Sequence, residues 1–248
     1  MPKDDLAPMD VHLPKELRQR TLDDEARLLT CFTDGTADKP KTYKKVCTYE
    51  TVRYPDNKFH AIRASLTIKG TVQECIQNFV EYASNIDESS PDQVLDLQVF
   101  QRFFFWDQAD RDVYEDIKRG GPLRPFSFYS HTCTRSPAPA IVKHRDMVVI
   151  GRLGVSDDSK QVTLTMQSVS YEDMQTNKAV RGKLDNNTFR FTQQDENTVL
   201  AETYCLADPL GAIPSWVYNT VLQQRCDVLV LLRQMIQGEA KPKYSHRK

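Results

Sequence analysis

The sequence predicts an α+β fold in which a curved antiparallel sheet wraps round one long C-terminal helix and encloses a cavity. Residues 215–236 contain no Gly or Pro, and their apolar face is broader than a third of a helix surface, so it needs a large apolar partner. Alternating apolar and polar segments precede this helix from residue 126 onward. Their short connections hold no crossover helices, which favours antiparallel pairing.

The first half of the chain mixes helices and strands. Its predicted elements are a helix from near Thr21 with Leu22, Ala26 and Leu29 on one side, strands from Lys41 and over 59–68, and an amphipathic helix over 70–84. We interpret 87–124 as a strand or short helix followed by a solvated turn.

The second half is dominated by strands. They are predicted over 126–133, 145–155, 161–171, 187–193 and 198–207. The last strand leads through the turn at Asp208 into the final helix, where Pro214 favours a helix start.

Composition excludes several classes of protein. The net charge of −1 offers no global field for nucleic acid, so we expect no nucleic-acid partner. The acidic first residues do not form a secretory signal, and no apolar run approaches the ~20 residues of a membrane span. We therefore expect a cytoplasmic protein. Its six cysteines are widely spaced without CxxC, which predicts reduced, buried thiols and no metal site.

Catalytic patterns find no support, and we predict neither an enzyme nor a cofactor. The chain has no GxSxG, and His60, His131 and His144 have no partner pattern. The acidic cluster over 107–116 lacks the spacing of a calcium-binding loop and is interpreted as a solvated face.

Three segments, in this order, resemble the START (StAR-related lipid-transfer) domain family. They are SPAPAIVKHRDMVVIGR (136–152), AVRGKL (179–184) and DPLGAIPSWVYNTVL (208–222), the last closest in wording to phosphatidylcholine-transfer-type members. The resemblance implies a helix-grip fold that holds one lipid in a tunnel gated by the C-terminal helix. It divides the chain into an N-terminal tail and docked helix (1–38), a START-like lipid-binding domain (39–238) and a basic tail (239–248).

The resemblance also implies which strand residues face the lipid. The family's strand orientation places Met147 and Val149 inward, and Leu164 and Met166 inward on the next strand. Sterol-binding members carry a buried Arg six residues after the Arg of the Arg-Asp pair, which is Gly151 here. This departure favours a phospholipid over a sterol, with ceramide or fatty acid also open.

Proteins that bind phosphocholine combine an aromatic cage for the quaternary ammonium with an arginine for the phosphate. The candidate rings are Phe103, Phe105, Trp106, Phe128, Tyr129 and Tyr204, and the candidate arginines are Arg102, Arg111 and Arg124. Ordinary core packing is the competing interpretation for each ring.

The final helix is expected to act as a lid. Lipid is predicted under its middle, near Tyr218, Leu222, Cys226 and Leu229. Ile213 and Trp216 are predicted to contact the membrane as a gate, because Trp favours the membrane interface. A monomer that binds membranes peripherally and transiently is expected.

The sequence therefore predicts non-enzymatic lipid binding and transfer. A lipid-sensing regulatory or interaction protein is the second hypothesis, and a helix-grip enzyme is the third.

Overall fold

The computed structural model describes residues 13–84, 98–134, 143–170, 179–211 and 213–239. The strands in these ranges are β1 (Thr36–Ala37), β2 (Lys41–Tyr43), β3 (Cys47–Arg53), β4 (Ala61–Lys69), β5 (Gln98–Phe105), β6 (Phe126–Thr134), β7 (Arg145–Val155), β8 (Gln161–Ser168), β9 (Val180–Arg181), β10 (Lys183–Asp195) and β11 (Thr198–Asp208). The helices are α1 (Glu16–Leu29), η2 (Thr30–Phe32), α2 (Val72–Ser84), α3 (Gln108–Lys118), α4 (Ser215–Val221), η3 (Leu222–Cys226) and α5 (Asp227–Ile236).

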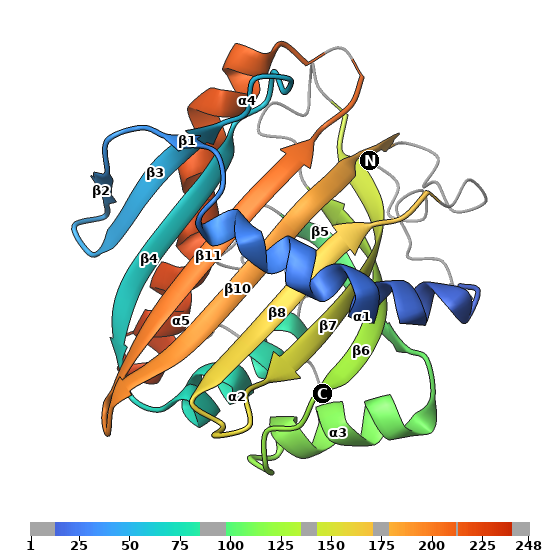
Figure 1. The fold of residues 1–248 in the computed structure, drawn as a ribbon, viewed down its shortest axis with the longest axis vertical. Coiled ribbons are helices and arrows are strands. Elements are labelled where there is room, and N and C mark those ends of the chain that lie inside the picture. The colour runs from blue at the N-terminus through green and yellow to red at the C-terminus, as the bar shows by residue number, and fades with distance from the viewer. Residues whose placement is uncertain (1–12, 85–97, 135–142, 171–178, 212, 240–248) are drawn as a thin grey trace.

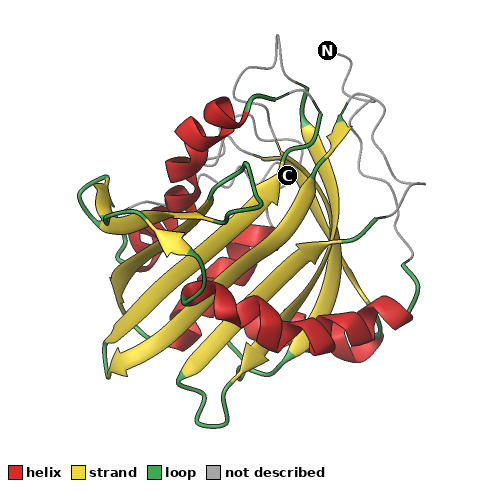
Figure 2. Cartoon of the chain, turned by 45° about the horizontal axis from the view of Figure 1, so that its top comes forward, coloured by secondary structure: helices red, strands yellow, loops and turns green. Residues whose placement is uncertain are grey.

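All the described strands belong to one sheet with the order β1-β3-β4-β11-β10-β8-β7-β6-β5, to which β2 and β9 add at the sides. Every pair along this path is antiparallel. The helix α1 crosses one face, here called the outer face, while α4, η3, α5 and α2 lie on the inner face (Figures 1 and 2). The predicted fold class, a curved antiparallel sheet with the C-terminal helix against it, is confirmed.

The two faces of the sheet carry separate cores. Inward residues of β7 such as Met147 and Val149 join the main core with α2 and α5. Their neighbours Val148 and Ile150 pack instead in an outer cluster with Tyr129. Successive strand residues point to opposite faces, so this alternation decides which side chains can reach the interior.

The helix α1 docks by Leu28, which is 2% exposed, and by polar side chains, so the predicted apolar face of Leu22, Ala26 and Leu29 is wrong. It begins at Glu16, and Leu22 is 40% exposed. The guanidinium of Arg152 pairs with Glu25 at 3.0 Å, and the Asn186 side chain donates to the Leu28 carbonyl at 2.8 Å. The outer face of the sheet carries charged and amide side chains here, and α1 supplies their partners.

Two predicted elements of the first half differ from the structure. The strand predicted from Lys41 is broken after Tyr43, because Lys44 and Lys45 adopt φ values of 47° and 64° and form a tight turn into β3. The charged stretch after Phe105 is the helix α3 rather than a turn. Its N-cap Asp107 accepts a hydrogen bond from the Asp110 amide at 2.9 Å.

Asp110 departs furthest from the solvated face predicted for the acidic cluster. It is 5% exposed and accepts a hydrogen bond from the Ser127 amide at 2.9 Å. Burial raises the pKa of its carboxyl above the ordinary value. The side chain therefore joins α3 to β6 as part of the structure.

The C-terminal helix has the predicted ends at Ser215 and Ile236 but is not continuous. A 3₁₀ segment, η3, separates α4 from α5. The Thr220 hydroxyl donates to the Trp216 carbonyl at 2.7 Å just before this break, an arrangement that bends helices. We call η3 and α5 together the lid segment.

All six cysteines are free and buried, as predicted for the thiols. Within the described ranges, no helix is long and apolar enough to cross a lipid bilayer.

Candidate functional site

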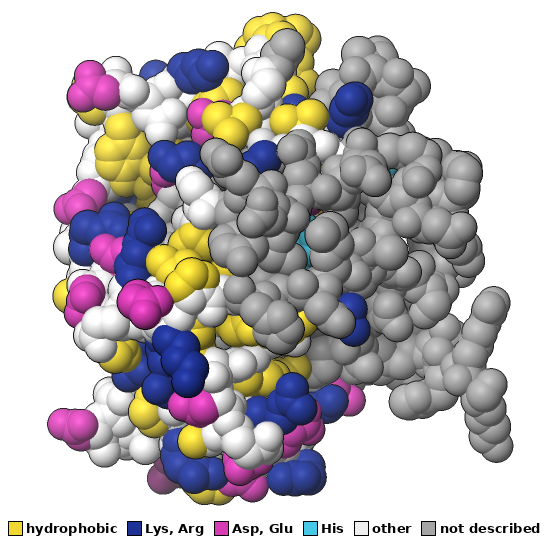
Figure 3. Space-filling view, turned by 90° about the vertical axis from the view of Figure 1, so that its right-hand side faces the viewer, with side chains coloured by type: hydrophobic (Ala, Val, Ile, Leu, Met, Phe, Trp, Pro, Cys, Tyr) yellow, Lys and Arg dark blue, Asp and Glu magenta, His cyan; other side chains and the backbone are white. Residues whose placement is uncertain are grey.

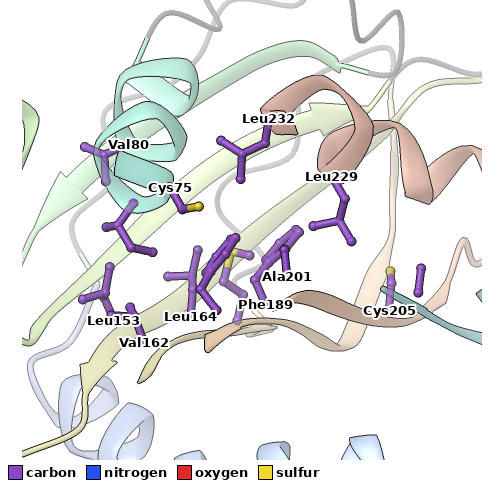
Figure 4. Packing of buried hydrophobic residues seen from close by; sticks show 14 of the residues in the cluster. Cys75, Val80, Leu153, Val162, Leu164, Phe189, Ala201, Cys205, Leu229 and Leu232 are labelled. Atoms are coloured by element: carbon purple, nitrogen blue, oxygen red, sulfur yellow. The ribbon is translucent and has the colours of Figure 1, made fainter. Parts of the chain in front are cut away.

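A cavity of about 130 Å³ lies between the inner face of the sheet and the helices. Strands β5, β6, β7, β8, β10 and β11 form one wall, and α2, α3 and the lid segment form the other. Most of its lining is apolar. Figure 4 shows Leu229 and Leu232 projecting from α5 toward the strand residues Leu164 and Phe189, which explains how the lid segment covers this space.

The four strand residues predicted to face the interior do so. Met147 and Val149 of β7 and Leu164 and Met166 of β8 all line the cavity. Strand alternation accounts for the agreement, because each pair is two residues apart. Their contact with a lipid stays a prediction.

The predicted lid residues lie beside the cavity rather than on its surface. Leu222, Cys226 and Leu229 are buried in the main core. The ring of Tyr218 packs edge-on against Phe59 with centroids 5.2 Å apart. Described lid residues on the cavity surface are Arg225 and Val228. The prediction assumed one regular helix, and the 3₁₀ segment changes which positions face the sheet.

The predicted aromatic cage is not assembled in the cavity. Trp106 and Tyr129 pack together on the outer face with ring centroids 4.8 Å apart. Tyr204 is also on the outer face, where its hydroxyl lies 2.8 Å from that of Tyr54. Phe105 packs against Tyr114 and Phe126 at the edge of the main core without lining the cavity.

Only Phe103 and Phe128 among the proposed rings line the cavity. Their centroids are 5.2 Å apart. Because Tyr129 follows Phe128 directly in β6, the two rings must point to opposite faces of the sheet. The full set of predicted rings therefore cannot share one pocket.

The proposed phosphate-binding arginines are also outside the cavity. Arg102 and Arg111 are exposed and lie over the rings of Phe104 and Phe105. Arg124 is exposed and pairs with Asp116 at 2.7 Å. The basic side chain that does line the cavity is Arg225, which is absent from the predicted set.

A signal for Arg225 is nevertheless present in the sequence. It lies on the apolar stripe formed by Val221, Val228 and Leu232, at helical spacing. A charge inside an apolar stripe needs a partner or a function. On β6, every second residue from Phe126 to Thr134 lines the cavity. This alternation follows from the pairing of β6 with β7.

The three sequence segments that resemble the START family meet at one end of the sheet. Arg145 donates to the carbonyls of Pro209 and Leu210, just before α4. The fully buried Asp146 pairs with Arg181 at 3.1 Å and lies 3.2 Å from the His131 ring. These contacts favour a structural role for Arg145, Asp146 and Arg181.

Gly151 has no space for a side chain. A Cβ at this position would lie 2.4 Å from the ring of Phe128, the residue opposite it on β6. Phe128 therefore occupies the space beside the Gly151 backbone.

The two predicted membrane-contact residues differ in exposure. Trp216 is 71% exposed at the start of α4, and Leu210 in the preceding turn is 38% exposed. Ile213 is half-buried. On the face shown in Figure 3, Lys and Arg side chains of the described residues are interspersed with Asp and Glu and form no single basic patch.

Comparisons with known proteins agree with this architecture. The structure is similar to human StAR-related lipid transfer protein 5 with a TM-score of 0.66 and 12% identity, covering 92% of this chain and 100% of that one. It is similar to human STARD10 with a TM-score of 0.61 and 12% identity, covering 94% of this chain and 83% of that one. The human StarD13 (DLC2) lipid transfer and protein localization domain gives a TM-score of 0.59 at 15% identity, covering 92% of this chain and 99% of that one.

A sequence search of curated proteins finds no significant relative. The family model described as START domain matches residues 93–233, which is more than half of the chain. The chain therefore belongs to the START domain family.

Proposed function

We propose that this protein is a non-enzymatic lipid carrier that holds one lipid in the cavity and exchanges it at a membrane surface. The observation that carries the proposal is a mostly apolar cavity between the sheet and the lid segment in a START-family chain. Apolar cavities with a few polar groups are typical ligand sites. The names of two similar structures, StAR-related lipid transfer protein 5 and the StarD13 domain, include lipid transfer.

Loading requires the lid segment to move. The cavity of about 130 Å³ is smaller than the ~300–1000 Å³ of typical ligand sites. The 3₁₀ segment η3 is a suitable hinge, because such breaks within helices mark hinges or strained positions. Outward movement of α5 would join the cavity to the small gap of about 10 Å³ between α5 and α2.

Membrane contact is proposed for the start of α4. Trp216, Leu210 and the half-buried Ile213 place apolar surface next to the turn that leads into the lid. Insertion of Trp216 at the interface would position this end of the cavity against the bilayer.

A phospholipid is favoured over a sterol as the cargo. The position at which the family's sterol-binding members carry a buried Arg is Gly151, and the Phe128 ring fills the adjacent space. The polar contact that these members use cannot form at this position.

Transfer of a fluorescent phosphatidylcholine between vesicles tests the proposal. The wild-type protein should accelerate transfer, and Met166→Trp, which fills the cavity, should abolish it. Val46→Trp is the control, since Val46 is 36% exposed at the β2–β3 turn. Absence of transfer by the wild type would contradict the carrier function, and binding without transfer would favour a lipid sensor.

A further inference from the structure

Arg225 is the sole charged side chain among the described residues that line the cavity. It lies in η3 and is partly accessible. Within the described part of the chain it has no carboxylate partner, and its polar neighbours are the Cys205 thiol and the Tyr218 hydroxyl. A charge that is removed from bulk water without an opposite charge is costly, so an arginine without an anionic partner at an apolar cavity needs a ligand or a functional reason.

The groups next to Arg225 do not neutralise it. The guanidinium interacts with the thiol of Cys205 and the hydroxyl of Tyr218. The Tyr218 hydroxyl is buried and carries no charge that could balance the guanidinium. Burial raises the pKa of this hydroxyl further, so it stays neutral. Neither neighbour supplies the negative charge that a guanidinium binds best.

Ser130 provides a second, independent observation. It lines the cavity, is 1% exposed, and its hydroxyl has no hydrogen-bond partner in the described part of the structure. Buried polar atoms are nearly always paired. An unpaired hydroxyl that faces the same cavity as Arg225 therefore points to a polar group of a ligand.

Polar side chains line two parts of the cavity, one on β6 and one on β10 and β11. On β6 the inward residues change from Phe126 and Phe128 to Ser130, Thr132 and Thr134. Across the sheet, Asn187 pairs with Cys205, the residue beside Arg225. In Figure 4, Cys205 lies at the opposite end of the view from Leu153 and Val162. Arg225 therefore lies on the side of the cavity that carries Asn187 and Thr203, away from Leu153.

We propose that Arg225 binds the anionic group of the carried lipid, a phosphate or a carboxylate, at this side of the cavity. The acyl chains occupy the side that Phe126, Leu153 and Leu164 line. A guanidinium binds either anion through two parallel hydrogen bonds. This inference rests on the proposed carrier function and adds the class of lipid. Because Arg225 belongs to the lid segment, the anionic lipid also holds the lid closed.

Extraction from vesicles of fluorescent lipids with identical acyl chains tests the inference. The probes are phosphatidic acid, phosphatidylcholine, a fatty acid and diacylglycerol, which has no anionic group. Wild-type protein should extract the two phospholipids and the fatty acid at least about tenfold better than diacylglycerol. Arg225→Met should lose this preference, and Arg225→Lys should retain part of it.

Arg233→Met is the matched control. Arg233 is a half-buried arginine on α5 that pairs with Glu239 at 3.6 Å and does not line the cavity. This variant should keep the wild-type preference. Thermal unfolding of each variant shows whether it folds, and the preference of the wild type tests the inference even if Arg225→Met does not fold.

The outcomes separate this inference from the proposed function. Equal extraction of diacylglycerol and the anionic lipids by the wild type would overturn the role of Arg225 while leaving the carrier function intact. Failure to extract any of the four lipids would contradict the carrier function itself. Titration with inorganic phosphate tests whether Arg225 binds a free anion instead of a lipid. Phosphate binding that requires Arg225, in a protein that shows no preference for anionic lipids, would overturn the assignment of Arg225 to a lipid head group.

Discussion

The guanidinium of Arg181 lies 3.1 Å from the carboxylate of Asp146, which is completely buried. Asp146 also lies next to His131, and the preceding Arg145 holds the turn before α4. One buried acidic side chain thus joins β6, β7 and β9, and the neighbouring Arg145 ties these strands to the turn before α4.

Replacing Asp146 should destabilise the protein strongly. Asp146→Asn removes the charge that Arg181 pairs with, and breaking a buried pair costs ~3–5 kcal/mol. Urea unfolding gives the change in free energy. Asp116→Asn, which breaks the exposed pair with Arg124, is the control and should cost less than about 1 kcal/mol. Equal losses for the two variants would contradict the structural role of Asp146.

Loosening the lid should speed lipid exchange. The ammonium of Lys44 lies 2.6 Å from Asp227, the first residue of α5, and the Tyr49 hydroxyl donates to Gln223 in η3 at 3.0 Å. Lys44→Ala should increase the transfer rate by less than about fivefold, because an exposed pair contributes ~1 kcal/mol or less. Lys45→Ala is the control in the same turn. An unchanged rate for Lys44→Ala would show that this pair does not restrain the lid.

Acid should weaken the docking of α1. Burial alone would raise the pKa of Asp24, but hydrogen bonds from Gln167, Arg20 and Arg27 outweigh it and hold the pKa below the ordinary value of 3.8. A carboxyl with a lowered folded-state pKa stabilises the fold above its unfolded-state pKa, and this contribution is lost as the pH falls through the folded-state value.

Asp24→Asn should therefore reduce stability at neutral pH and make stability depend less on pH below about 4. Thermal unfolding across pH 2–7 measures both effects. Asp23→Asn, at the exposed neighbouring position, is the control. The same acid sensitivity in wild type and Asp24→Asn would contradict the assignment.

The cysteines should resist thiol reagents in the folded protein. Burial raises the pKa values of Cys31, Cys75 and Cys133 to about 12, and the thiolate is the reactive form. A chromogenic disulfide reagent at pH 8 should react slowly with folded protein and rapidly with all six thiols in urea. Rapid reaction of one of these three in the folded state would show an opening that the structure does not contain.

Much of the sheet was predictable, because its signals are local. The alternation over β7 indicates which residues face inward, and Met147 and Val149 follow it. The helix α2 followed from its apolar spacing and begins at Val72. These elements depend on side-chain periodicity, which the sequence displays directly.

The rest of the candidate site depends on tertiary relationships. The 3₁₀ break before Asp227 changes which lid residues face the cavity, so Arg225 and Val228 line it instead of Leu222 and Leu229. The placement of Tyr204 on the outer face follows from strand pairing and not from its aromatic character. The type of side chain alone does not show whether an aromatic ring faces the cavity or packs in a cluster on the outer face.

Native mass spectrometry of the purified protein tests the carrier function most directly. We expect a species carrying one lipid per chain in the wild type, and a lipid-free species in Met166→Trp, whose larger side chain fills the cavity. A wild-type protein that stays lipid-free after incubation with phospholipid vesicles, or a Met166→Trp variant that carries as much lipid as the wild type, would contradict it.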